Sequence, residues 1–112
     1  IGVTCQVWGR AGINRFIDRE VSTANLYERL QTLVDLGRAY VVLPGGTGTL
    51  LELAFVWELA NKKLLNRRPI VLVGDCWPGV VECVSRDDPR SVDVIQLAEG
   101  PDEAVEIIAR RL

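Results

Sequence analysis

Residues 44–52 read PGGTGTLLE, and this stretch joins two segments of different character. The run before it, Ala39–Leu43, is apolar and carries bulky and β-branched residues, which predicts a buried strand. The segment after it, Leu50–Leu65, is apolar on nearly all sides of a helical wheel. The sequence therefore predicts a strand, a glycine-rich turn and a helix in succession.

The glycine-rich turn has the features of an anion-binding loop. The first turn of a helix has unpaired N–H groups and a partial positive charge, so a phosphate binds there without a dedicated cation. Gly45, Gly46 and Gly48 let the backbone approach such a ligand and adopt positive φ where needed, and Thr47 and Thr49 add hydroxyl donors. The turn lacks the lysine of a P-loop and does not match G-x-G-x-x-G.

Glu52 has two compatible interpretations. Thr49-x-x-Glu52 has the spacing of a capping box, in which Thr49 caps the helix and Glu52 reaches back to the cap N–H. The carboxylate of Glu52 can equally face a ligand. The chain contains no histidine, so acid–base chemistry near neutral pH has to come from carboxylates, lysine, tyrosine, cysteine or water.

Composition predicts one small globular domain over residues 1–112, because 48% of the chain is hydrophobic. A net charge of −2 without a long basic run disfavours nucleic acid as a partner. We expect no membrane contact and a cytoplasmic location, since no apolar run approaches a membrane span. We expect Cys5, Cys76 and Cys83 to be buried free thiols, with neither a metal site nor a disulfide.

Upstream of residue 44, the pattern predicts a strand over Ile1–Trp8, a loop over Gly9–Val21 and a helix over Ser22–Leu36. Ser22 or Thr23 is the expected N-cap of that helix, and Gly37 its expected end. Arg29 lies at the edge of the apolar face. At such a position the aliphatic part of an arginine side chain can cover the core while its guanidinium reaches a cleft. An exposed arginine that pairs with a neighbouring carboxylate is the alternative.

Downstream, Pro69–Gly74 reads as a buried strand, and Asp75–Gly79 follows at its carboxyl end, where parallel sheets bind ligands. Trp77 is a candidate for stacking on a base, and Asp75 for bonding a hydroxyl or a base edge. A turn with a packing tryptophan is the alternative. The remaining elements are expected to be a helix from Val80, a strand over Val92–Leu97 and a last helix opening at Gly100–Glu103.

The alternation of strands and helices predicts an α/β fold with a Rossmann-like, doubly wound parallel sheet and right-handed crossovers. A helix that is apolar all round, as predicted for Leu50–Leu65, has to be buried on more than one side. We expect the second surface to be another subunit, which makes a homodimer. Cover by a missing N-terminal part is the alternative.

The nonapeptide P-G-G-x-G-T-x-x-E resembles the signature of the LOG family, once described as possible lysine decarboxylases, and the resemblance runs from Gly2 to about Val84. It implies a nucleoside 5′-monophosphate phosphoribohydrolase that forms homodimers. It also implies that this chain is the C-terminal portion of the domain, because the family's earlier glycine-rich βαβ portion has no match here.

The resemblance implies roles for individual residues. Gly45, Gly46, Thr47, Gly48 and Thr49 would hold the phosphate or ribose of a nucleotide, Glu52 would be the catalytic carboxylate, and Arg29 would match the family's active-site arginine. Leu30 stands where the family has a lysine. The alternative function is binding without catalysis, as in molybdenum-cofactor carriers of related fold.

No cofactor is expected. Decarboxylation of lysine would require pyridoxal phosphate on a Schiff-base lysine. The only lysines, Lys62 and Lys63, lie late in the predicted helix without a supporting motif.

Overall fold

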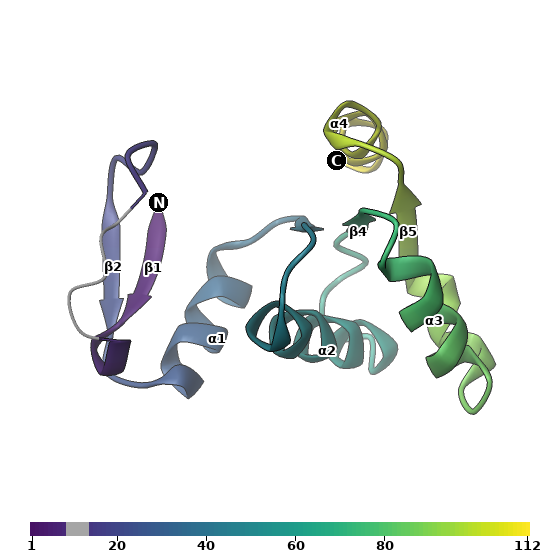
Figure 1. Ribbon diagram of the computed structural model, residues 1–112, viewed down its shortest axis with the longest axis horizontal. Helices are drawn as coiled ribbons and strands as arrows, with labels where there is room; N and C mark the ends of the chain where they lie inside the picture. Colours follow the sequence, from purple (N-terminus) through teal and green to yellow (C-terminus); the bar gives the residue numbers. More distant parts are fainter. Residues whose placement is uncertain (9–13) are drawn as a thin grey trace. The chain divides into compact units, whose positions relative to one another are not determined.

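The computed structural model describes residues 1–8 and 14–112. Its elements fall into two compact units, Ile1–Gly37 and Arg38–Leu112. In chain order the elements are β1 (Gly2–Cys5), the 3₁₀ helix η1 (Gln6–Trp8), β2 (Glu20–Thr23), α1 (Leu26–Leu36), β3 (Tyr40–Val42), α2 (Thr47–Asn61), β4 (Ile70–Val73), α3 (Trp77–Ser85), the 3₁₀ helix η2 (Pro89–Val94), β5 (Ile95–Ala98) and α4 (Pro101–Arg111) (Figure 1).

In the first unit, β1 and β2 form a parallel pair. The predicted loop over Gly9–Val21 is wrong where it meets β2, and its residues 9–13 lie outside the described residues. The β2 sequence EVST is short and mostly polar, so it carries little of the apolar alternation that marks a strand. Thr23 is nevertheless buried, and its hydroxyl donates a hydrogen bond to the carbonyl oxygen of Thr4 at 2.6 Å.

Helix α1 begins later than predicted, because Ser22 and Thr23 belong to β2. The N-cap is Asn25, whose side-chain oxygen accepts a hydrogen bond from the N–H of Glu28 at 3.0 Å. The predicted end is confirmed: the helix stops at Leu36, and the N–H of Gly37 donates to the carbonyl of Leu33.

In the second unit, β3, β4 and β5 form a parallel sheet in that order. The predicted α/β fold with parallel strands is confirmed. The predicted strand after Pro69 is also confirmed as β4, the central strand, and all of its residues are buried. A strand whose two faces are both covered has to be apolar throughout, and IVLV meets that requirement.

Each face of β4 belongs to a different layer. Val71 and Val73 pack with Ala98 and Ala104 in one core, against which Ile107 and Ile108 of α4 also lie. Ile70 and Leu72 alternate with those valines and therefore point to the opposite face. Figure 1 shows α2 and α3 on the side of this sheet away from α4. The three layers of the second unit are thus α4, the sheet, and α2 with α3.

Helix α2 begins earlier and ends earlier than the predicted Leu50–Leu65. Its buried residues are Leu53, Val56 and Trp57, whereas Leu50 and Leu51 are 45% and 47% exposed. The indole N–H of Trp57 donates to the carbonyl oxygen of Ser91 in η2 at 2.9 Å. This bond ties α2 to the segment that leads into β5.

The last elements also differ from the prediction at their boundaries. Helix α3 starts at Trp77 rather than Val80, since a proline such as Pro78 is tolerated in the first turn of a helix. The predicted strand from Val92 begins only at Ile95, after the 3₁₀ turn η2. Helix α4 is as predicted, with Gly100 as N-cap and acidic residues in its first turn.

Candidate functional site

The PGGTGT stretch lies at the junction between the end of β3 and the start of α2. Strand β3 ends at Val42, Gly46 is the N-cap of α2, and Thr47 is the first helical residue. Residues 44–48 are exposed and Thr49 is half-buried. The predicted succession of strand, glycine-rich turn and helix is therefore confirmed, with the threonines inside the first turn of the helix rather than before it.

This helix start has free hydrogen-bonding capacity. The first N–H groups of any α-helix lack acceptors within the helix. Within the part of the chain that the structure describes, no side chain caps Gly46. The donors of the first turn, together with the partial positive charge of the helix end, face an exposed surface that suits an anion.

The three glycines of the stretch have different reasons to be glycine. A Cβ on Gly45 would collide with the side chain of Thr49, so packing inside the turn requires a glycine there. A Cβ on Gly46 or Gly48 would meet nothing within 4 Å. Neither packing nor backbone conformation demands glycine at these two positions, since the described glycine with positive φ is Gly74. Gly45, Gly46 and Gly48 do not use the positive φ that glycine allows, and close approach by a ligand stays a prediction.

Glu52 lies half-buried on α2, one helical turn after Gly48 and Thr49. The predicted capping box is wrong, because the N-cap is Gly46 and Thr49 is already the third helical residue. Helical side chains lean toward the N-terminus of their helix. Because Glu52 comes four residues after Gly48, the two residues lie on the same face of α2.

The end of β4 lies against the start of the glycine-rich stretch. Gly74 has φ +127°, and a Cβ built on it would lie 2.7 Å from Cγ of Pro44. Only glycine fits both the conformation and the space. This contact brings the turn after β4, with the exposed carboxylate of Asp75, beside the glycine-rich stretch.

Trp77 is the first residue of α3, and its ring is only 3% exposed. This burial favours the packing alternative over stacking on a base. The indole Nε1 atom is buried and has no hydrogen-bond partner among the described residues. The indole of Trp57, which is also buried, does have one.

Arg29 belongs to the first unit, on α1, and is half-buried. Its Nε atom donates to the carbonyl oxygen of Val3 at 3.1 Å, which anchors α1 to β1. Leu30, next to it, is also half-buried. The guanidinium of Arg29 therefore makes a structural hydrogen bond, and its role toward a ligand stays a prediction.

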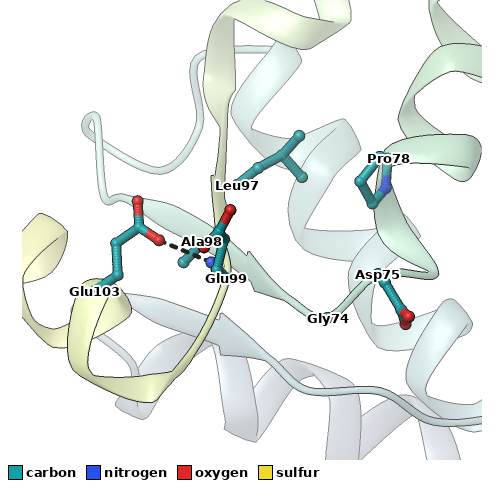
Figure 2. A pocket seen from close by; sticks show the side chains of 7 residues that line it. All are labelled: Gly74, Asp75, Pro78, Leu97, Ala98, Glu99 and Glu103. Carbon is teal, nitrogen blue, oxygen red and sulfur yellow. Dashed lines mark hydrogen bonds between the residues drawn. The ribbon is translucent and has the colours of Figure 1, made fainter.

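A cavity of about 930 Å³ opens between the turns that follow β4 and β5. It is lined by Gly74, Asp75, Pro78, Leu97, Ala98, Glu99 and Glu103. Figure 2 shows Leu97 extending toward Pro78 across this space, and Glu103 turned back toward Glu99. Oε2 of Glu103 accepts a hydrogen bond from the N–H of Glu99 at 2.8 Å, which fixes the turn into α4.

Sequence reasoning singled out Asp75 but missed the β5 side of the cavity. The available signal was the rule that ligands bind beyond the carboxyl ends of parallel strands, applied to β5 as well as β4. The predicted strand Val92–Leu97 begins three residues before β5 and ends one residue before it, and Glu103 is predicted only as part of the start of the last helix.

Across residues 1–8 and 14–112, no group of three or more His, Cys, Asp or Glu side chains is arranged to hold a metal ion. All three cysteines are free. Cys5 is buried as expected, but the prediction is wrong for Cys76, the N-cap of α3, and for Cys83 within α3, which are both exposed. Among the described helices, none has the length and apolar character needed to cross a membrane.

Comparison with known proteins gives two matches. The family model described as "Possible lysine decarboxylase" matches residues 1–108. A protein of Mycobacterium marinum (strain ATCC BAA-535 / M), named cytokinin riboside 5′-monophosphate phosphoribohydrolase, is 48% identical over 60 residues. The aligned residues are 54% of this chain and 31% of that relative, so the chain matches about a third of the relative's length. With nearly its whole length matched by the family model, this chain belongs to the possible lysine decarboxylase family, also called the LOG family.

Proposed function

We propose that this chain hydrolyses the N-glycosidic bond of a nucleoside 5′-monophosphate and releases the free base and ribose 5-phosphate. The observation that carries the proposal is the exposed, uncapped start of α2, where Gly46 and Gly48 leave open space in front of the helix N-terminus. Family membership and the name of the Mycobacterium marinum relative support the same reaction class.

The phosphate is the part of the substrate that this helix start suits. Backbone N–H groups of Thr47, Gly48 and Thr49 supply donors, and the threonine hydroxyls add two more. A phosphate held there fixes the nucleotide at a point remote from the bond that breaks. Binding energy from that end then orients the reacting end.

Glu52 is the proposed catalytic carboxylate. Cleavage at C1′ passes through an oxocarbenium-like state, which a nearby negative charge stabilises. The carboxylate also accepts a proton from the attacking water, whose oxygen bonds to C1′ while the C1′–N bond breaks. The leaving base takes up a proton from solvent, and Glu52 then returns its own proton to solvent. Since the chain has no histidine, a carboxylate beside the phosphate loop is the acid–base group that the sequence offers here.

Arg29 is proposed to orient the substrate or balance its charge. The permanent positive charge of its guanidinium suits the negative charge of a nucleotide. Asp75 is proposed to contact ribose or base, since its turn lies beside Pro44.

We also propose that the protein is a homodimer through the helix within Leu50–Leu65. Leu50 and Leu51 on α2, and Leu64 just after it, are between 45% and 65% exposed. Burying such leucines against a second copy is favourable by about 25 cal/mol per Å². Sedimentation equilibrium would show a dimer that a Leu51→Glu substitution converts to a monomer.

Binding without catalysis is the second candidate. Leu30 in place of the family's lysine favours it, because a leucine cannot supply the charge. In that case the same helix start holds a nucleotide or another phosphorylated ligand, and no product forms.

The deciding experiment is chromatographic detection of free base after the chain is incubated with a panel of nucleoside 5′-monophosphates and the matching nucleosides. Base released from monophosphates but not from nucleosides is the expected result, because the phosphate is the anchor. Phosphate-dependent binding without any release would replace the hydrolase by the carrier. Equal release from nucleosides would remove the phosphate anchor from the proposal.

A further inference from the structure

The cavity between the β4 and β5 turns borders the glycine-rich stretch. Gly74 belongs to both: it lines the cavity, and its Cα lies so close to Pro44 that a Cβ would be 2.7 Å from the proline ring. A ligand anchored at the start of α2 therefore has a neighbouring hollow within the same unit. Its volume of about 930 Å³ is within the usual range for small-molecule sites.

The lining has a distinct chemical character. Pro78 and Leu97 face each other across the space and give it apolar walls (Figure 2). Asp75, Glu99 and Glu103 supply carboxylates, and no lysine or arginine is among the described residues of the lining. Such a cavity accepts a flat, weakly polar group that donates hydrogen bonds, and it repels an anion.

The two neighbouring regions thus have opposite electrostatic preferences. The helix start attracts the negative end of a ligand, and the cavity disfavours a negative charge. A nucleoside 5′-monophosphate has this polarity, with a doubly charged phosphate at one end and a base at the other. The charge pattern therefore favours the phosphate at the start of α2 and the base in the cavity.

We propose that this cavity receives the base, and that it selects bases with amino donors and rejects bases that carry a negative charge. The proposal rests on the proposed function, since it places the phosphate at the start of α2. Glu99 supplies the selecting charge together with Asp75. Glu103 holds the turn through its bond to the Glu99 N–H.

Isothermal titration calorimetry on the 112-residue chain tests this with four ligands. They are cytidine, uridine and orotidine 5′-monophosphates and ribose 5-phosphate. Every titrated chain carries Glu52→Gln, which is expected to keep nucleotide binding without hydrolysis, and chromatography confirms that each ligand stays intact. Orotidine 5′-monophosphate differs from the uridine compound by a carboxylate on the base. We expect affinity to fall from cytidine to uridine to orotidine.

Three variants test whether the cavity lining determines the affinity for each nucleotide. Glu99→Gln should reduce the uridine-to-orotidine affinity ratio by roughly two- to fivefold, as expected for one exposed charge. Leu97→Trp, which fills the hollow, should weaken all three nucleotides. Both should leave ribose 5-phosphate unchanged, because it has no base. Asp102→Asn is the matched control, since Asp102 lies in the first turn of α4 but outside the lining.

The outcomes separate this proposal from the proposed function. Unchanged nucleotide affinities in Glu99→Gln and Leu97→Trp would overturn the base cavity, while intact ribose 5-phosphate binding and base release would leave the hydrolase standing. An Asp102→Asn effect as large as that of Glu99→Gln would also overturn it. Selective binding without base release would support the cavity and remove the hydrolase. If none of the four ligands binds, both the base cavity and the proposed hydrolase are overturned.

Discussion

Gly74 and Pro44 are packed so closely that no side chain fits between them: a Cβ on Gly74 would lie 2.7 Å from Cγ of the proline. Pro44 lies two residues after β3 and Gly74 directly follows β4, so this contact links the turns that follow two neighbouring parallel strands. The link between the glycine-rich stretch and the cavity is therefore the backbone of Gly74 packed against the ring of Pro44.

Replacement of Gly74 tests this link. Gly74→Ala should destabilise the fold by about 1–3 kcal/mol, because φ of +127° is strained for an L residue and the methyl group meets Pro44. Urea unfolding measures the loss. Gly79→Ala is the control: Gly79 lies in α3 with nothing within 4 Å of a Cβ, so its replacement should stabilise by about 0.5–1 kcal/mol. Equal effects at the two positions would contradict the packing described here.

The glycines of the PGGTGT stretch should separate stability from binding. Gly45→Ala should destabilise, since its methyl group collides with Thr49. Gly48→Ala meets open space, so it should leave stability unchanged or raise it by up to about 1 kcal/mol. Loss of close approach should nevertheless weaken ribose 5-phosphate binding about tenfold, the equivalent of one hydrogen bond. Full affinity in a stable Gly48→Ala variant would show that the ligand does not approach this residue.

Glu52→Gln should lower the rate of base release by about 10²–10⁴-fold while nucleotide binding is retained, because the amide keeps the shape but neither accepts the proton nor carries the charge. Chromatography measures release, and calorimetry measures binding. Glu58→Gln is the control on the same helix, where Glu58 is exposed and pairs with Lys62 at 3.6 Å. Turnover by Glu52→Gln at the rate of the unmodified chain would remove Glu52 from the mechanism.

The two buried tryptophans provide a matched pair. Trp57→Phe removes the donor to the Ser91 carbonyl and leaves that oxygen unsatisfied, so it should cost about 1–3 kcal/mol of unfolding free energy. Trp77→Phe removes an indole N–H that has no partner among the described residues, so the loss should be smaller. Chemical denaturation of both variants gives the comparison. A larger loss at Trp77 would indicate that its N–H does have a partner.

The cap of α1 gives a prediction in the first unit. Asn25→Ala should cost about 1 kcal/mol, because the Glu28 N–H loses its acceptor. Ser22→Ala, at the cap expected from sequence alone, should have little effect because Ser22 is an exposed residue of β2. Thermal unfolding followed by circular dichroism distinguishes them. The reverse order of effects would place the start of the helix at Ser22.

Elements with a strong pattern could be predicted from sequence, and weakly patterned ones could not. Strand β4 is a continuous apolar run bounded by Pro69 and Gly74, and α4 has Pro, acidic and basic residues at the expected positions. The start of α2 was placed three residues late, because glycine and threonine have low helix propensity and tertiary context overrides it. Strand β2 has a polar sequence that only its pairing with β1 makes into a strand.

Part of the candidate site could likewise be predicted from the sequence, and part could not. The glycine-rich stretch and Glu52 are contiguous in sequence, so their common location at one helix start followed from the residues themselves. The cavity joins Asp75 to Glu99, which are far apart in the chain, and only the parallel register of β4 and β5 brings their turns together. Whether a residue lines the cavity depends on which strand ends beside it.

The central position of β4 in the sheet has a consequence for hydrogen exchange when a ligand binds. Its neighbours on both sides and the layers on both faces make its amides the ones that open only when the whole unit unfolds. In hydrogen–deuterium exchange, these amides should be the slowest, and the exposed 44–48 stretch among the fastest. A ligand bound at the start of α2 should then slow exchange in β4 by mass action on global unfolding, even though it touches none of that strand's side chains.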